Sequence, residues 1–503
     1  MSADSTHTNQ IDLQFDNSYA GLPEAFFAHC APTPVASPKL LRYNQALAES
    51  LGINIADEQS LATIFAGNQL PTGATPIATA YAGHQFGQFV PQLGDGRAIL
   101  LGETLDNDGK RFDIQLKGAG PTPFSRGGDG RAPIGPVLRE YILSEAMHAL
   151  GVPTTRALAA VATDSPVYRE TELPGGVITR VGSSHLRVGT FQFFAARQDI
   201  ENLQTLTDYV IQRHYPECID AGLPVLAMLN AVVERQAKLI AHWMKYGFIH
   251  GVMNTDNMTI AGETIDYGPC AFMDTFKTDK VFSSIDHGGR YAYGNQPVLA
   301  QWNLARLAET LLPLIDDDKD RAVALATETL DRYTTLYENN WLEQMSYKLG
   351  VGGSSEQVKP LLTTLLQAME DQALDYSLTF RSLIELAEEL LRDGPEQAND
   401  SLVVIRIFPD NQQRLEWLQQ WHSALQTRPE TAIALMQQNS PIYIPRNHRV
   451  ELAIRAAEDN DNYEPFNKLC DVLEDPFVEQ PGAEQYALPP DPAQVVQRTF
   501  CGT

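Results

Sequence analysis

The chain has 503 residues, enough for two or three domains or for a two-lobed catalytic body with a large helical extension. Hydrophobic residues make up 43% of it, which is enough for a sizeable core and excludes a disordered chain. The 63 acidic residues outnumber the 37 basic ones, and the net charge of −26 argues against binding to a nucleic-acid backbone.

Targeting and cysteine patterns point to the cytoplasm. Residues 1–16 are polar and lack the apolar core of a secretory signal, and no apolar run is long enough for a membrane-spanning helix. The cysteines lack the spacing of zinc ligands, which is typical of a reducing compartment; they are Cys30, Cys218, Cys270, Cys470 and Cys501. We therefore expect a cytoplasmic protein with no membrane and no nucleic-acid partner.

Residues 1–75 look irregular, with short helices such as 40–51, and a β-hairpin follows them. Gly94 and Gly96 open it, and Asn107-Asp108-Gly109 is typical of a tight turn. Residues 111–117 then alternate, which puts Lys117 on the face opposite the apolar one. A turn of backbone N–H groups before a strand lysine is what a kinase-type nucleotide site needs, although most strand lysines face solvent.

A glycine-rich stretch, 118–131, comes next. It predicts either a flexible connector or a second loop around phosphate, with Arg126 and Arg131 as candidate cations. The following helix ends at Gly151, and Glu140 and Glu145 on it are both placed to pair with the strand lysine.

Residues 177–194 predict strands broken at a Gly-Ser-Ser turn, and they carry Arg180 and Arg187. Arginine suits bidentate contacts with phosphate, but ordinary ion pairs are about as common. Apolar periodicity beyond this point predicts helices at 201–213, 228–247, 298–315, 320–342, 357–374, 382–391, 412–425 and 450–458. Residues 481–492 form a proline-rich tail.

The stretch from His250 to Gly268 carries the chemistry. A polar loop ends in Asp256-Asn257, two short apolar segments follow, and Asp266 opens a Tyr-Gly turn. In kinase-like folds such an Asn and Asp hold Mg²⁺, and an Asp five residues before the Asn accepts the hydroxyl proton. Val252 stands there in this chain and cannot accept a proton. Either the chemistry is lost, or Asp256 beside the metal ligand supplies the base.

Several long motifs resemble the selenoprotein O family. They are residues 83–87, 92–97, 115–120, 126–131, 250–257 and 266–268, and the likeness extends over nearly the whole chain. Members of that family carry selenocysteine or cysteine third from the C-terminus, where this chain has Cys501.

The resemblance implies an α+β, protein-kinase-like two-lobed fold with a large helical C-terminal extension. It implies that ATP binds in a flipped orientation and that AMP is transferred to Ser, Thr or Tyr hydroxyls of protein substrates. Asp256 would be the base, Asn257 and Asp266 would bind Mg²⁺ or Mn²⁺, and Glu140, or else Glu145, would pair with Lys117. The residues expected to contact the nucleotide are Gly94, Gly96, Arg97, Lys117, Asp129, Gly130, Arg180, Arg187 and Asp266.

The expected parts are an N-terminal lobe (1–196), a catalytic lobe (197–300), a helical extension (301–480) and a tail (481–503). The resemblance also implies a redox disulfide between Cys270 and Cys501. Two alternatives stay open: a kinase that moves the γ-phosphoryl group with Asp256 as a relocated base, and an inert nucleotide-binding scaffold. A metal-dependent hydrolase is a distant further alternative, because the sequence lacks the spacing of a water-activating metal site.

Overall fold

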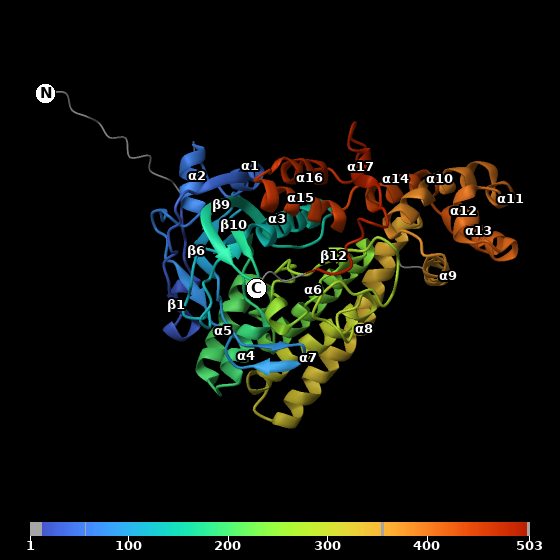
Figure 1. The fold of residues 1–503 in the computed structure, drawn as a ribbon. Helices are drawn as coiled ribbons and strands as arrows, with labels where there is room; N and C mark the ends of the chain where they lie inside the picture. Colours follow the sequence, from blue (N-terminus) through green and yellow to red (C-terminus); the bar gives the residue numbers. More distant parts are fainter. Residues whose placement is uncertain (1–12, 56, 354–356, 500–503) are drawn as a thin grey trace.

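The computed structural model describes residues 13–55, 57–353 and 357–499. An eight-stranded antiparallel sheet forms its first part, with the strand order β1-β3-β6-β7-β10-β9-β2 and β8 paired to β10 (Figure 1). The strands are β1 (Phe27–His29), β2 (Lys39–Tyr43), β3 (Ile77–Thr79), β6 (Ala98–Leu105), β7 (Arg111–Lys117), β8 (Ala132–Pro133), β9 (Arg156–Tyr168) and β10 (Glu172–Gly182).

Strands β6 and β7 form the predicted hairpin, and Lys117 at the end of β7 lies between Ala98 and Ile178 in the register. The apolar side chains of β7 pack under α1 (Gln45–Ser50) and α2 (Glu58–Phe65). The opposite face of β7 is polar yet buried, with Asp113 and Gln115 enclosed rather than solvated. A buried polar face needs partners, and these partners lie in the candidate site.

Helix α3 (Ile134–Ala149) crosses that second face of the sheet. Its other side packs against α15 (Asn447–Asn460) and α16 (Glu464–Glu474), which come from the far end of the chain. Figure 1 shows these two helices between the sheet and the helices of residues 376–425. The C-terminal helices therefore complete the core around α3.

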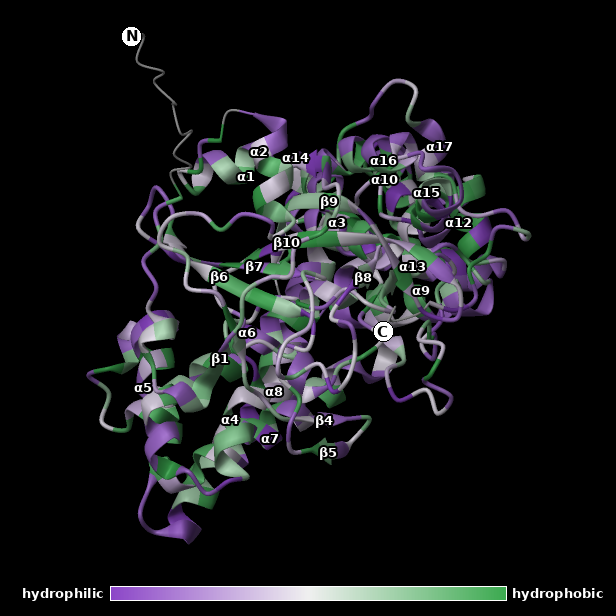
Figure 2. Ribbon diagram, turned by 60° about the vertical axis from the view of Figure 1, so that its left-hand side comes forward, coloured by the Kyte–Doolittle hydropathy of each residue, from purple (hydrophilic) through white to green (hydrophobic). Residues whose placement is uncertain are grey.

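The rest of the described chain is mostly helical, as expected, and the class is α+β. The long helix α6 (Pro224–Tyr246) is its buried centre and packs against α7 (Gln296–Ile315) and α8 (Lys319–Lys348), along which polar and apolar residues alternate (Figure 2). The remaining helices are α4 (Val188–Ala195), α5 (Ile200–His214), α9 (Val358–Asp371), α10 (Tyr376–Asp393), α11 (Pro395–Ala398), α12 (Leu402–Ile407), α13 (Asn411–Leu425), α14 (Pro429–Asn439) and α17 (Glu484–Ala487).

Short elements connect these parts. Two-stranded ribbons are formed by β4 (Gly83–Gln85) with β5 (Gln88–Val90) and by β11 (Phe248–Ile249) with β12 (Ala271–Phe272). Single turns of 3-10 helix are η1 (Tyr19–Gly21), η2 (Glu24–Phe26), η3 (Pro216–Cys218), η4 (Thr255–Asn257) and η5 (Tyr293–Asn295). None of the helices in the described ranges is both long and apolar enough to cross a membrane.

Two predictions of secondary structure were wrong. Residues 188–194, expected as strand, form helix α4, because a buried segment of this length lacks the periodicity that separates helix from strand. Residues 40–51, expected as one helix, form strand β2 and then the short helix α1, which Asn44 caps by accepting a hydrogen bond from the Leu47 N–H.

Candidate active site

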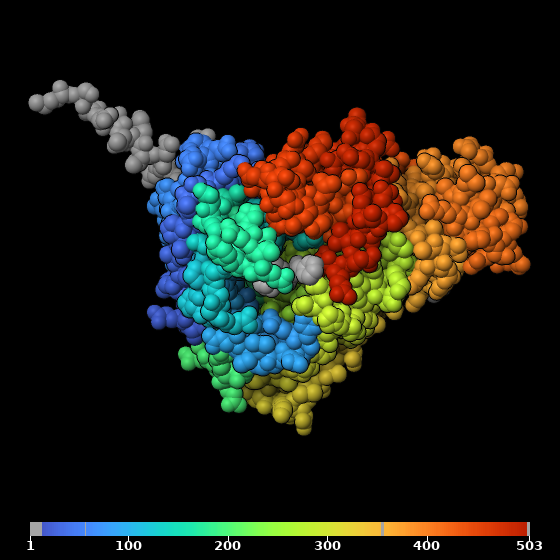
Figure 3. Space-filling view, viewed as in Figure 1, coloured from blue at the N-terminus to red at the C-terminus, as the bar shows by residue number. Residues whose placement is uncertain are grey.

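A cavity of about 720 Å³ opens between the sheet and the helical part, a size typical of small-molecule sites. Figure 3 shows the surface hollowed there, between the sheet and the helices of the second half. Its walls come from β7, β10, α3, the glycine-rich loop and the loop around η4.

The cavity is more cationic than the rest of this acidic protein. Seven basic side chains line it, against five acidic ones. The basic residues are Arg97, Lys117, Arg126, Arg131, Arg169, Arg180 and Arg187, and the acidic ones are Asp95, Asp129, Glu140, Asp256 and Asp266. A local excess of positive charge in a chain of net charge −26 favours an anionic ligand.

The predicted strand lysine and helix glutamate meet in this cavity. Lys117 Nζ lies 2.7 Å from Glu140 Oε2 and 2.9 Å from Asp266 Oδ1. Glu145, the alternative partner, instead binds Arg156 and accepts from the Asn44 side chain. The geometry therefore selects Glu140, which lies earlier on α3 and on a different face of the helix.

Two buried arginines complete the cluster. Arg180 donates from Nε to Glu140 Oε1 at 2.7 Å and from Nη2 to Asp266 Oδ1 at 2.7 Å. Arg187 donates to Asp266 Oδ2 at 3.0 Å and to the Asp256 carbonyl at 2.9 Å. Burial would raise the pKa of the Asp266 carboxyl, but Lys117 and these two arginines hold it well below its ordinary value.

Asp266 has a left-handed backbone, with φ of +61°, which a residue other than glycine adopts at a cost. The flanking loops hold it there: Thr264 N–H bonds to the Pro153 carbonyl, and Tyr267 OH bonds to Thr154. The two apolar segments before it, residues 258–260 and 263–265, do not form a regular hairpin. Each instead makes one isolated bridge, Thr259 with Arg187 and Thr264 with Thr154.

The oxygen donors suited to a divalent cation are few but appropriate. The Asn257 amide donates from Nδ2 to the Val252 carbonyl at 3.0 Å, so its orientation is fixed while its oxygen can serve as a ligand. Asp266 also lines the cavity, and Mg²⁺ typically takes one or two protein oxygens and fills its other positions with phosphate and water. Within the described ranges, no group of three or more His, Cys, Asp or Glu could form a metal cage.

Asp256 lies on η4 at the cavity wall, with its side chain almost fully buried. Oδ2 accepts from Gln85 Nε2 at 3.3 Å, while Oδ1 has no hydrogen-bond partner among the described residues. Burial raises the pKa of the Asp256 carboxyl to about 6, only partly offset by its own backbone N–H and by Arg187. A carboxylate with this pKa is ionised at neutral pH and still basic enough to accept a proton.

Gly94 and Gly96 line the cavity, as expected, but the loop behind them also requires glycine there. A Cβ on Gly94 would lie 2.4 Å from the Phe124 ring, and Gly94 has φ of +90°.

Asp95, between Gly94 and Gly96, is a residue of the cavity wall that sequence reasoning missed. It is buried and accepts from the backbone and side chain of Thr79, with Arg187 Nη2 3.8 Å away.

Arg169 is a second residue that sequence reasoning missed. It lies just after β9 and forms a two-pronged ion pair with Asp129, at 2.9 and 3.1 Å, which ties β9 to the glycine-rich loop. A Cβ on Gly130 would lie 2.0 Å from the Gly120 carbonyl oxygen, so this loop folds tightly on itself. Arg97 lines the same wall. The loop is thus an ordered wall and not a flexible connector.

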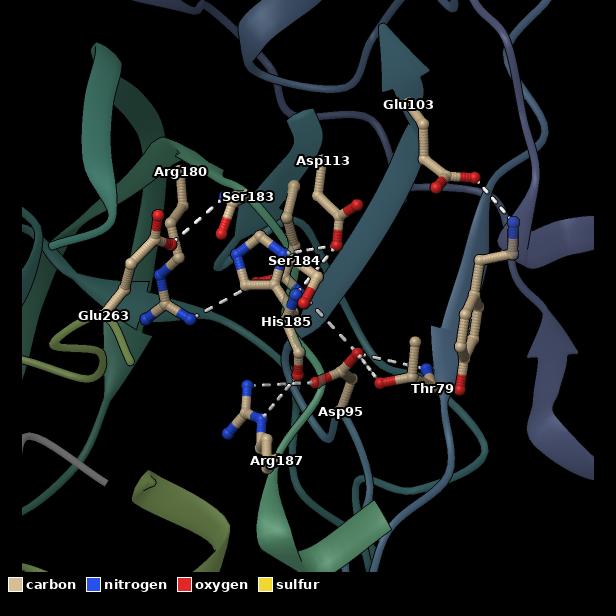
Figure 4. Close-up of polar contacts among 12 residues, drawn as sticks. Thr79, Asp95, Glu103, Asp113, Arg180, Ser183, Ser184, His185, Arg187 and Glu263 are labelled. Carbon is tan, nitrogen blue, oxygen red and sulfur yellow. Dashed lines mark hydrogen bonds and ion pairs between the residues drawn. The ribbon is translucent and has the colours of Figure 1, made fainter. Parts of the chain in front are cut away.

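A buried polar network supports the site from behind (Figure 4). Asp113 on β7 accepts from His185 Nδ1 at 3.0 Å and from Arg213 on α5 at 2.6 Å. Glu263 accepts from the Ser183 N–H at 3.1 Å, and burial raises its pKa to about 7. These contacts join the strand with Lys117 to the turn before Arg187.

The last described residues lie beside the segment that holds Cys270. Thr499 N–H donates to the Phe282 carbonyl at 2.8 Å, and its side chain donates to the Pro269 carbonyl at 2.5 Å. Cys501, the expected partner of Cys270, lies outside the described residues.

Comparison with known proteins identifies the family. A family model described as protein adenylyltransferase SelO matches residues 9–474. A protein named protein nucleotidyltransferase YdiU from Rhizobium meliloti (strain 1021) is 56% identical over 495 residues, 98% of this chain and 99% of the relative. Proteins of the same name are 57% identical in Rhizobium johnstonii (97% of each chain) and 54% identical in Bradyrhizobium sp. (strain BTAi1) (98% of this chain and 100% of the relative).

The matching family and these relatives place the chain among the nucleotidyltransferases. Within that class it belongs to the SelO family, over nearly its whole length. The resemblance seen in its motifs is thereby confirmed.

Proposed function

We propose that the protein transfers AMP from ATP to Ser, Thr or Tyr hydroxyls of other proteins and releases pyrophosphate. One observation carries the proposal: a buried carboxylate, Asp256, lies at the cavity wall next to Asn257, while residue 252 is valine. The hydroxyl oxygen attacks the α-phosphorus as its proton passes to Asp256. The bond between the α-phosphorus and the bridging oxygen then breaks, and pyrophosphate leaves with that oxygen.

Lys117, Arg180 and Arg187 are the groups proposed to stabilise the departing pyrophosphate. They come from a strand end, a strand and a helix start, and Glu140 and Asp266 hold them in place before any ligand binds. Donors held in this way need little reorganisation as negative charge develops. Gly94, Gly96, Arg97, Asp129 and Gly130 are proposed to line the nucleotide, from the walls of the same cavity.

Asn257 and Asp266 are the residues proposed to hold Mg²⁺ or Mn²⁺, since both ions accept such oxygen ligands. When bound, the ion neutralises phosphate charge. Lys117, Arg180 and Arg187 engage the Asp266 carboxylate in the structure. A triphosphate offers these cations other acceptors, so nucleotide binding releases Asp266 to serve as a ligand.

The contact of Thr499 with Pro269 supports the redox hypothesis, in which Cys501 pairs with Cys270 and restrains the segment that follows Asp266. Loss of activity on oxidation that a Cys501→Ser variant still showed would contradict it. A cytoplasmic location and the kinase-like arrangement of lobes stay predictions from the sequence.

The test is label transfer to the protein itself from α-³²P-ATP and, in parallel, from γ-³²P-ATP, under reducing conditions. We expect label only from the α position, and we expect Asp256→Asn to lower the rate by roughly 100-fold or more while ATP still binds. Label only from the γ position would identify a kinase with a relocated base. Label from neither, with ATP bound, would identify an inert scaffold.

A further inference from the structure

The ribbon formed by β4 and β5 is separate from the main sheet. It lies on the helical part beside α4 and α7 (Figure 2). Its first strand runs along the loop that carries Asp256, although the two segments are far apart in sequence. His84 N–H donates to Thr255 Oγ1 at 2.7 Å, and Phe86 N–H donates to Asn254 Oδ1 at 3.1 Å.

The same loop is held from its other side. Thr255 Oγ1 donates to Gln192 Oε1 on α4 at 2.7 Å, and the Gln192 amide nitrogen lies 2.8 Å from His84 Nδ1. Asn254 Oδ1 also accepts from Tyr291 OH at 2.6 Å. The residues before Asp256 are therefore fixed by three separate segments, namely backbone N–H groups of the ribbon, the Gln192 side chain on α4 and the Tyr291 hydroxyl.

Two residues of the ribbon touch the Asp256 carboxylate itself. The Gln85 amide donates to Oδ2 at 3.3 Å. On the other side, Gly83 leaves the space in which Oδ1 lies: a Cβ built on Gly83 would be 2.5 Å from Oδ1 and 3.0 Å from the Asp256 Cβ and Cγ. The φ angle of Gly83 is not positive, so its backbone conformation is open to other residues. Glycine is required at this position because a side chain would collide with Asp256.

We propose that Gly83 and Gln85 are positioning residues for the transfer reaction, which set the orientation of the Asp256 carboxylate from its two sides. Gln85 fixes one oxygen, and Gly83 reserves the volume for the other. The inference rests on the proposed role of Asp256 as the base. It explains why a Gly-His-Gln stretch stands at residues 83–85. In this proposal Gly83 and Gln85 influence the reaction through their contacts with Asp256 and not through contacts with the nucleotide.

The experiment measures the maximal rate of α-label incorporation into the protein itself and the ATP concentration that gives half that rate. Gly83→Ala and Gln85→Leu should each lower the maximal rate by about 10- to 100-fold, because a displacement near 1 Å costs this much. The half-saturating ATP concentration should stay within about 2-fold of that of the wild type, since Asp256 is not a nucleotide ligand in this proposal.

Matched controls separate positioning from damage to the ribbon. Gln88→Leu changes the exposed cross-strand partner of Gln85, and Gly222→Ala adds a methyl group with nothing within 4 Å. Both should keep the wild-type rate. Wild-type rates in Gly83→Ala and Gln85→Leu would overturn the proposal, as would an equal loss in Gln88→Leu. If the wild type transfers no α-label, the proposed function fails, whereas α-transfer that needs Asp256 but tolerates both substitutions refutes this inference alone.

Discussion

Carboxylates within the stretch 256–266 behave in opposite ways because their neighbours differ. Burial raises the pKa of Asp256 to about 6, whereas Lys117 and two arginines overcome the same effect at Asp266 and lower its pKa. Environments that separate the pKa values of neighbouring acids are typical of sites that assign them different roles. Asp256 suits proton transfer, and Asp266 suits a permanent negative charge.

Glu263 provides a pH-dependent contribution to stability. Burial raises its pKa from 4.5 to about 7, so the folded protein holds this proton more tightly than the unfolded chain does. The associated stabilisation is complete below about pH 4.5 and is lost as the pH rises through 7. Glu263→Gln should therefore raise the free energy of unfolding by about 1–3 kcal/mol at pH 8 and much less at pH 5, in urea titrations at both values. An equal effect at both values would contradict this origin.

The ion pairs of Asp266 predict that binding of the metal and binding of the nucleotide strengthen each other. Lys117, Arg180 and Arg187 each form an ion pair with the Asp266 carboxylate. We expect Mn²⁺ to bind about 10-fold or more tightly when a non-hydrolysable ATP analogue is present, within the usual range of coupling energies. The free Mn²⁺ signal in electron paramagnetic resonance measures this directly. Equal affinity with and without the analogue would show that Asp266 is accessible from the start.

Sequence reasoning singled out candidate residues that follow strong local patterns, and the fold brings several of them together. Lys117, Glu140, Arg180, Arg187 and Asp266 all meet in one cluster. Asp95 and Arg169 were missed because an aspartate between glycines and an arginine after a strand have many ordinary uses, and only the tertiary fold brings them to the cavity. Nothing in the local pattern predicts that Gly83 lies against Asp256.

At the scale of elements, helix α3 connects the site to the core. Its inner face presents Glu140 to two cations, and Glu145 holds Arg156 at the start of β9. The periodicity of the sequence predicted this helix but could not choose between the two glutamates, because each lies near the sheet. The choice depends on the rotation of the helix, which packing sets.

The two glutamates should therefore respond differently to the same substitution. Glu140→Gln removes the buried carboxylate shared by Lys117 and Arg180, which then keep only Asp266, and we expect about 3 kcal/mol lower stability and weaker ATP binding. Glu145→Gln changes a half-buried pair away from the cavity, so it should cost about 1 kcal/mol and leave ATP affinity unchanged. Calorimetric titration with ATP and urea unfolding of both variants check this. Equal losses of ATP affinity would contradict the assignment.

At the scale of the molecule, a buried arginine joins distant segments. Arg446, before α15, donates to Asp274 and, at 2.8 Å, to Asp375 before α10. Asp274 follows β12, close to the segment with Cys270. The sequence predicted the helices of this region but not how they dock, because such docking depends on single long-range contacts.

Arg446→Met should leave two carboxylates without their cation and lower the free energy of unfolding by about 3–5 kcal/mol. Arg449→Met, on α15, removes a cation over the Tyr486 ring and a hydrogen bond to the Gln485 carbonyl, and should cost less than about 1 kcal/mol. Urea unfolding of both variants provides the comparison. A loss for Arg446→Met no larger than for Arg449→Met would show that this cluster does not hold the parts together.

The packing of α15 and α16 on α3 determines when the core around α3 can form during synthesis of the chain. The apolar side of the helix that carries Glu140 is covered by residues 447–474, which are synthesised long after that helix. Contacts across so great a sequence separation form late and slow the folding of a chain. A nascent chain therefore exposes this side of α3 until residues 447–474 have emerged from the ribosome, and the cluster around Lys117 gains its full support only then.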